Sequence, residues 1–127
     1  MPTLRMGKAF IYEDGGADFL ARVIAPNGNS ASSGNTNTIT YAVFDLDCDN
    51  IANPVSSGSL ALTVLSGLKT DSRWTVDSTG YNFKDSRTPS DFPAGGHTYR
   101  VEYLFTPVSG QPFFVCFEVT TVRVYTS

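Results

Sequence analysis

The sequence predicts an all-β fold, a two-sheet sandwich of about seven antiparallel strands that ends in a C-terminal hairpin. Nine of the twelve acidic residues are aspartate, which favours turns, whereas glutamate favours helix surfaces. Several segments alternate apolar and polar residues with the period of two that strands require. The length of 127 residues suits a single core, so we expect one domain over residues 1–127.

The first five strands are expected between turn-rich segments. The short runs KAFIYE and DFLARVI predict strands at 8–13 and 18–24. TITYAVFDL and SLALTVL alternate more regularly and predict strands at 38–47 and 59–66. RWTVD, continuing through GYNFK, predicts a strand at 73–84.

The last two strands, at 98–106 and 113–125, form the clearest local pattern. Apolar rows run along both strands, and a loop of Val108, Ser109 and Gly110, with Gly110 in the left-handed conformation, fixes how they pair. Phe105 then faces Phe113, and on the other face Arg100 stands opposite Glu118. A slip of two residues would set Glu102 against Glu118, which like-charge repulsion disfavours. The predicted pairs on the apolar face are Phe105–Phe113, Tyr103–Val115, Val101–Phe117 and Tyr99–Val119.

Four local motifs carry a resemblance to a known family. They are the turn Asp77 to Gly80, the loop Phe92 to Gly95, the Gly-Gly-His-Thr-Tyr step at 95–99, and the Tyr-x-Val-x-Tyr strand at 99–103. With the strand order, they resemble an immunoglobulin-like domain, similar to the small modules of tailed-phage structural proteins. The chain departs from antibody domains, since Phe114 stands two residues before Cys116 and the Cys-Trp-Cys core is absent.

Composition disfavours several partners. The net charge is −3 and the basic residues are scattered, so we expect no nucleic-acid surface. The longest wholly apolar run is Phe113 to Phe117, far below the roughly 20 residues that span a bilayer, so we expect no membrane partner. The first fifteen residues lack the apolar core of a secretory signal, and Cys48 and Cys116 are expected to be free thiols.

Catalysis and cofactor binding have little support. His97 is the only histidine, and no nucleophile elbow surrounds any serine. A carboxylate pair for glycoside hydrolysis would need Glu102 with Glu118 or two aspartates, and Glu118 is expected instead to pair with Arg100 across the hairpin. No phosphate-binding loop occurs. We therefore expect no enzyme activity and no cofactor.

The acidic stretch DLDCDN at 45–50 has two interpretations. Asp45, Asp47 and Asp49, with acids from the neighbouring loops, could supply the oxygen ligands of a calcium ion. The same residues are also those that cap turns at strand ends. The EF-hand pattern fails, because Asn50 stands where glycine is needed. The sequence favours turn capping and leaves a cation site open.

Two polar loops and the N-terminal segment form the candidate interface. In an immunoglobulin-like sandwich the loops at 26–37 and 107–111 emerge at the same end. The first is a solvated connection or a recognition surface, and residues 1–7 are expected to be an arm that contacts other subunits or to extend an edge strand. The candidate interface residues are Leu4, Met6, Asn27, Asn29, Asn35, Asn37, Ser109 and Gln111.

The resemblance implies a non-enzymatic structural component of a large assembly. The expected assembly is the virion of a tailed bacteriophage, put together in the host cytoplasm, in which the chain is a head decoration, neck or tail protein. Its partners would be virion subunits and repeated copies of itself in a homo-oligomer. The alternative is a carbohydrate- or surface-binding module, with or without calcium.

Overall fold

A computed structural model describes residues 4–12, 16–26, 28–47, 52–72, 74 and 77–122, with the backbone path alone for residues 4–12. It contains eight strands and two short 3-10 helices among these residues. The strands are β1 (Leu4–Tyr12), β2 (Ala17–Ala21), β3 (Thr36–Asp45), β4 (Ser56–Leu60), β5 (Leu65–Lys69), β6 (Tyr81–Arg87), β7 (Thr98–Pro107) and β8 (Phe113–Val122). The 3-10 helices are η1 (Leu62–Val64) and η2 (Pro89–Asp91).

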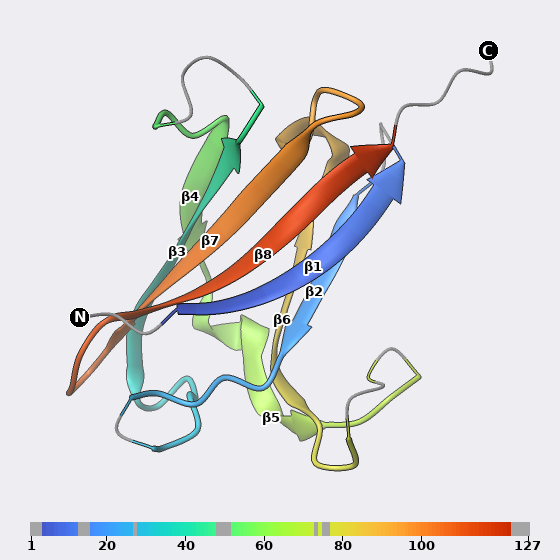
Figure 1. Ribbon diagram of the computed structural model, residues 1–127. Helices are drawn as coiled ribbons and strands as arrows, with labels where there is room; N and C mark the ends of the chain where they lie inside the picture. Colours follow the sequence, from blue (N-terminus) through green and yellow to red (C-terminus); the bar gives the residue numbers. More distant parts are fainter. Residues whose placement is uncertain are drawn as a thin grey trace.

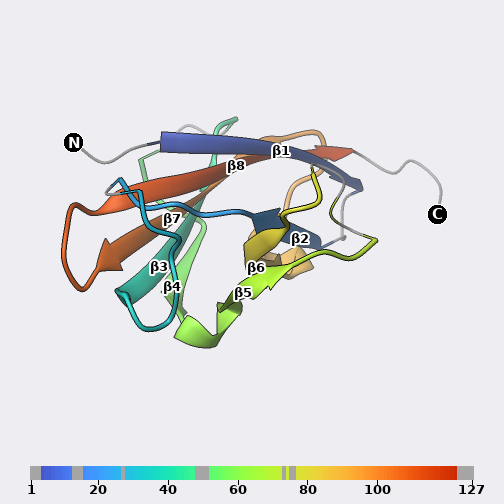
Figure 2. The ribbon, with the colours of Figure 1, turned by 90° about the horizontal axis from the view of Figure 1, so that it is seen from below.

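The strands form two sheets that pack face to face, which confirms the predicted all-β sandwich (Figures 1 and 2). The larger sheet has the order β1-β8-β7-β3-β4, and the smaller has the order β2-β6-β5. In the immunoglobulin sandwich one sheet has the order A-B-E-D and the other the order G-F-C, with C′ added in variable-type domains. β2, β6 and β5 occupy the places of B, E and D, and β8, β7, β3 and β4 those of G, F, C and C′. The strand count is eight, one more than the sequence suggested.

The first strand differs from its prediction in two ways. β1 begins at Leu4, four residues before the predicted start at residue 8, so residues 4–7 extend an edge strand, which is the second of the two alternatives for the N-terminal segment. It also runs parallel to β8, with Leu4 beside Phe114 and Tyr12 beside Val122, so the strands are not all antiparallel. Alternation of apolar residues carries no information on strand direction, because both kinds of pairing have a period of two.

The C-terminal hairpin pairs as predicted. The pairs Phe105–Phe113, Tyr103–Val115, Val101–Phe117 and Tyr99–Val119 all occur, and Arg100 stands opposite Glu118. Gly110 has φ of +114°, as the turn requires. β7 ends at Pro107, directly before the predicted loop, and β8 begins at Phe113, as predicted.

Two predicted strands have wrong boundaries. The segment predicted as one strand at 59–66 leaves the larger sheet after Leu60, passes through η1, and enters the smaller sheet at Leu65. The segment predicted at 73–84 contains a turn, in which Asp77 Oδ1 accepts hydrogen bonds from the backbone N–H groups of Thr79 and Gly80. β6 therefore starts only at Tyr81 and extends to Arg87.

The core consists of aromatic and β-branched side chains from both sheets. The ring of Phe83 in β6 lies 4.9 Å from that of Tyr103 in β7, and the ring of Phe19 in β2 lies 4.6 Å from that of Phe117 in β8. All four residues are buried. Burying one such side chain contributes roughly 1.5–3 kcal/mol, so these rings supply much of the free energy that holds the sheets together.

A tyrosine corner fixes the entry into β7. Tyr99, the second residue of β7, accepts a hydrogen bond on its hydroxyl from the backbone N–H of Ala94 over 2.8 Å. Such a contact, in which a tyrosine near the start of the penultimate strand binds the backbone a few residues upstream, recurs in immunoglobulin-type sandwiches. This corner was not predicted from the sequence, because Phe114 stands two residues before Cys116 and the tyrosine lies one strand earlier.

Candidate functional site

A buried asparagine positions the loop between β2 and β3 (residues 22–35). The Asn82 side chain accepts a hydrogen bond from the Val23 N–H over 2.6 Å and donates to the carbonyls of Val23 and Ala31. The loop itself folds back through a bridge between Ile24 and Ser30. Because Asn82 lies in β6, the loop is tied to the smaller sheet and has a defined path.

Asn35 joins this loop to the loop between β7 and β8 (residues 108–112). Its side-chain oxygen accepts hydrogen bonds from the Ser32 N–H and the Thr36 hydroxyl, and its amide donates to the Ser30 carbonyl. Its backbone carbonyl accepts a hydrogen bond from the Val108 N–H over 3.0 Å. The two loops therefore meet at one end of the sandwich, as the sequence predicted.

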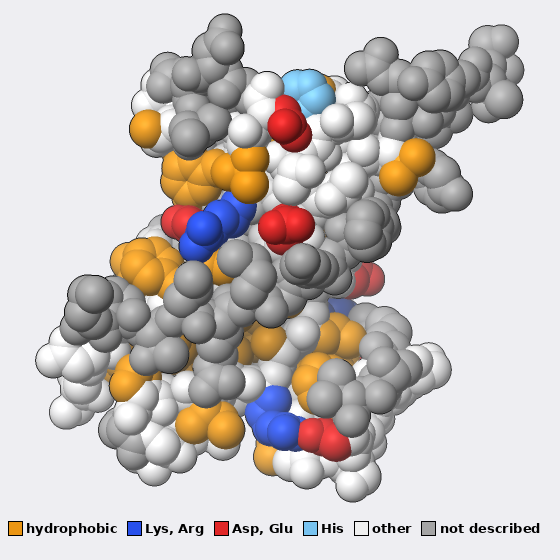
Figure 3. All heavy atoms as spheres, viewed as in Figure 1, with side chains coloured by type: hydrophobic (Ala, Val, Ile, Leu, Met, Phe, Trp, Pro, Cys, Tyr) orange, Lys and Arg blue, Asp and Glu red, His pale blue; other side chains and the backbone are white. Residues whose placement is uncertain are grey.

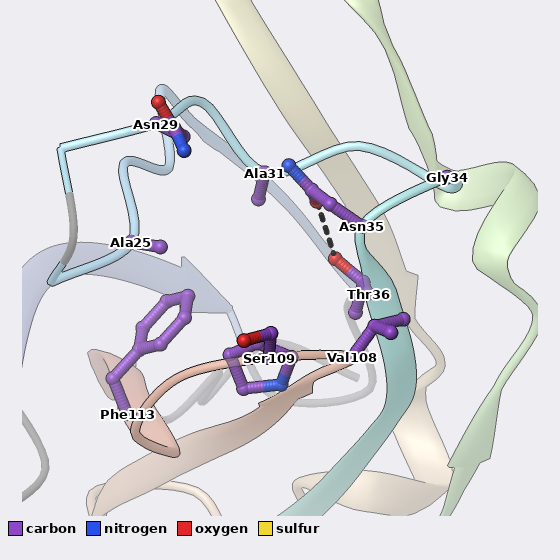
Figure 4. A pocket seen from close by; sticks show the side chains of 10 residues that line it. Ala25, Asn29, Ala31, Gly34, Asn35, Thr36, Val108, Ser109 and Phe113 are labelled. Carbon is purple, nitrogen blue, oxygen red and sulfur yellow. Dashed lines mark hydrogen bonds between the residues drawn. The ribbon is translucent and has the colours of Figure 1, made fainter.

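A pocket of about 380 Å³ lies between the two loops; we call it the loop pocket (Figure 4). Its apolar lining comes from both loops and both adjoining strands, namely Ala25, Ala31, Pro107, Val108 and Phe113. Its polar lining consists of Asn29, Asn35, Thr36 and Ser109, with Gly34 completing the wall. Val108 is 68% exposed, the highest value among the exposed large apolar side chains of the described residues.

The lining of the loop pocket suits binding better than chemistry. None of its ten lining residues carries an ionisable side chain. Phe113 is 2% exposed, so its ring contributes an edge of the wall and offers no open face for stacking. The pocket can accept an apolar side chain and form hydrogen bonds at its rim.

The structure gathers some of the predicted interface residues and separates others. Asn29, Asn35 and Ser109 line the loop pocket, while the exposed Asn37 and Gln111 lie at the same end without lining it. Leu4 and Met6 are in β1, beside Phe114 and Cys116 in register, so the strand starts near this end. Asn27 lies outside the described residues.

Sequence reasoning missed the apolar half of the pocket. Ala25 and Ala31 are small residues in a polar loop, and Phe113 was assigned to the hairpin face alone. The one available signal was Val108, a large apolar residue in a turn, where polar residues are usual.

At the other end of the sandwich, the carboxylates of Asp45 and Asp47 bind backbone N–H groups where β3 ends. Buried Asp45 lies 2.8 Å from His97 Nδ1 through Oδ2, and its Oδ1 accepts a hydrogen bond from the Asp47 N–H. Asp47 Oδ2 accepts a hydrogen bond from the Thr98 N–H over 2.6 Å. These contacts agree with the turn-capping interpretation of both residues.

The cation interpretation gains no ligand cluster from the described residues. Within them, no three His, Cys, Asp or Glu side chains are placed so as to hold a metal ion together. Asp49, the third member of the proposed set, and Cys48 lie outside the described residues.

Cys116 is a free thiol, as predicted. Burial raises the pKa of this thiol, an effect that the nearby Arg100 partly offsets.

A second polar cluster lies inside the sandwich. The Tyr103 hydroxyl donates to Asp85 Oδ2 over 2.6 Å, and Arg87 Nε lies 2.9 Å from the same oxygen as an ion pair without hydrogen-bond alignment. The Arg87 guanidinium also lies 3.9 Å from the centre of the Tyr41 ring. Asp85, Lys69 and Lys84 border a hollow of about 440 Å³. The Asp85 carboxylate, however, already binds Tyr103 and Arg87. The cluster is therefore a structural network.

Figure 3 shows the described side chains on the face of the larger sheet, coloured by type. Acidic, basic and hydrophobic side chains are interspersed there, and Arg100 Nε lies 2.9 Å from Glu102 Oε2. In the part of the chain that the structure describes, no helix has the length and hydropathy to cross a membrane.

Comparison with models of known protein families found no match, and comparison with curated proteins found none either.

Proposed function

We propose that this protein is a non-enzymatic structural subunit of a large assembly and that the loop pocket receives a neighbouring subunit. The loop pocket carries this proposal, because it combines an apolar lining, a rim of amides and hydroxyls, and the highly exposed Val108. Exposed apolar side chains set beside a concave surface are typical of protein interaction sites. Its lack of ionisable side chains supports a binding role over a catalytic one.

The assembly that we propose is the virion of a tailed bacteriophage, formed in the host cytoplasm. This part rests on the resemblance of the sequence motifs to immunoglobulin-like phage modules. The strand order and the Tyr99 corner agree with that resemblance at the level of the fold. The chain would then be a head decoration, neck or tail component present in repeated copies.

The test is the mass of the particle that contains this chain. Tagged protein is recovered from cells producing the assembly and measured by mass photometry, with electron microscopy of the same fraction. We expect particles of many times the 13.7 kDa chain mass. Val108→Asp should leave the chain outside these particles, since a charge would enter an apolar contact.

The matched control is Leu46→Asp, at an exposed apolar position of the opposite end. It should enter particles normally, and both variants should keep the thermal transition of the wild-type domain. Normal incorporation of Val108→Asp would refute the role of the loop pocket. Recovery of the wild-type chain only as free protein would refute the assembly itself.

A carbohydrate-binding module is the second candidate, favoured by the amide and hydroxyl side chains around the pocket. Asn35 already uses its side-chain oxygen and amide within the loop, and the buried Thr36 donates its hydroxyl to that oxygen, so the exposed Ser109 would have to contribute to the contacts with a sugar. Binding of the wild-type chain on a glycan array, lost in Ser109→Asp, would favour this function over a subunit contact.

A further inference from the structure

Among the strands that the structure describes, β4 forms one edge of the larger sheet and has a neighbour on one side only. It pairs with β3 from Ser56 to Leu60 and ends the strand order of that sheet, on the left of Figure 1. An edge strand presents backbone N–H and C=O groups that no neighbouring strand satisfies. Such an edge can accept a further strand from another chain.

The other three edges carry features that discourage strand addition. β1 contains Arg5 and Lys8, and β2 contains the exposed Asp18. β5 ends in Lys69, and its register with β6 shifts between Leu65 and Lys69. Charges and irregular pairing are the usual means of protecting an edge. β4 has the sequence SSGSL, without a charge or proline, and its pairing with β3 is regular.

We propose that two copies of this chain pair through β4, antiparallel about a two-fold axis at Gly58. This register pairs all five residues of the strand with their counterparts. Gly58 meets Gly58, Ser57 meets Ser59, and Ser56 meets Leu60, so small residues adjoin the axis and no like charges oppose each other. The two larger sheets then form one continuous sheet.

The residues that flank β4 fit the same register. Val55 precedes the strand and is 43% exposed, and Ala61 follows it in an extended conformation and is also exposed. The two-fold axis at Gly58 brings Val55 of each copy beside Ala61 of the other. Exposed apolar surface is thereby covered at both ends of the paired strands. A second copy of β4 therefore fits this edge. Its backbone groups can pair with those of the first copy, its small side chains allow close approach at the axis, and no like charges oppose each other.

The register provides a charge test. In Ser57→Lys/Ser59→Lys, each lysine at 57 faces a lysine at 59 of the other copy, and symmetry creates this contact twice. In Ser57→Lys/Ser59→Glu, the same positions hold opposite charges. Both serines are exposed, so neither variant disturbs the core. We expect self-association roughly tenfold weaker than wild type in the first variant and at least as strong as wild type in the second.

Sedimentation velocity over a concentration series measures these affinities on the full chain, with thermal unfolding as the check that each variant folds. The proposal expects a wild-type dimer of twice the 13.7 kDa chain mass. A wild-type protein that stays monomeric throughout would overturn it, as would equal affinities of the two double variants. These variants lie along a sheet edge and leave the loop pocket intact, so this outcome is independent of the proposed subunit contact there.

Discussion

The Tyr103 hydroxyl donates a hydrogen bond to Asp85 over 2.6 Å and joins the two sheets of the sandwich through a polar contact. Tyr103 lies in β7 of the larger sheet and Asp85 in β6 of the smaller one, and both residues are buried. The surrounding core is aromatic, with Phe83 packed edge-on against the Tyr103 ring. A buried carboxylate in such surroundings is tolerated because Tyr103 and Arg87 both bind it.

Tyr103→Phe should lower the free energy of unfolding by about 2 kcal/mol, because Asp85 loses a short hydrogen bond and gains no replacement. Urea denaturation measures this loss. Tyr81→Phe is the matched control, since the Tyr81 hydroxyl donates to Asp71, which is exposed and can bind water instead. It should cost less than about 1 kcal/mol. Equal losses in the two variants would contradict a special role for the Tyr103 contact.

Alkaline pH should destabilise the protein through Tyr103. Burial, together with the negative charge of Asp85, raises the pKa of Tyr103 far above its ordinary value of 10.0. The folded state then keeps the tyrosine proton where the unfolded state has lost it. The contribution of the protonated Tyr103 to the free energy of unfolding is therefore complete below about pH 10. Above that pH it falls by up to about 1.4 kcal/mol per pH unit. Urea denaturation from pH 8 to 12 gives the free energies of unfolding of wild type and of Tyr103→Phe, and the difference between them isolates this pH dependence. A difference that stays constant over this range would refute it.

Gly80→Ala should be far more destabilising than Gly28→Ala. Both glycines have positive φ, +101° and +91°, so alanine is strained at either position. A Cβ at Gly80 would also lie 2.2 Å from the Lys69 carbonyl oxygen, whereas a Cβ at Gly28 would meet nothing within 4 Å. We expect about 1 kcal/mol for Gly28→Ala and several times that for Gly80→Ala. Thermal unfolding measures both, and similar melting temperatures would contradict the close approach of β5 to Gly80.

Asn82→Ala should release the loop that forms one wall of the loop pocket. It removes three hydrogen bonds, each worth about 1 kcal/mol, and leaves the Val23 N–H buried without its acceptor. Hydrogen exchange should accelerate at the amides of Val23 and Ala31 more than at amides of the β7–β8 hairpin. Asn37→Ala, at an exposed position, is the control and should change neither. Unchanged exchange in Asn82→Ala would show that the loop holds its path by other contacts.

The sequence was most informative where two patterns agreed. In the β7–β8 hairpin, the apolar rows and the charges of Arg100 and Glu118 select the same register, and the structure has it. Between Leu60 and Leu65, the alternation continues although the chain changes sheets, because Leu60, Leu62 and Val64 all pack against the core. Period-two patterning reports which residues are buried and leaves open which sheet buries them.

The candidate site was predictable in place and only partly in composition. Knowledge of the fold class brings the two polar loops to one end, and Asn29, Asn35 and Ser109 followed from that. The apolar lining depends on tertiary contacts such as that of Asn82 with the β2–β3 loop, which connects residues far apart in the sequence. No local pattern encodes such a contact.

The pairing of β1 with β8 has a consequence for biosynthesis. Leu4 lies beside Phe114 and Tyr12 beside Val122, so the first of the eight described strands to leave the ribosome pairs with the last of them. Contacts so distant in sequence close slowly, because the intervening polypeptide must first be organised. During translation the β1 backbone has no β8 to pair with until that strand is synthesised. In this interval a chaperone or a neighbouring nascent chain could bind to it.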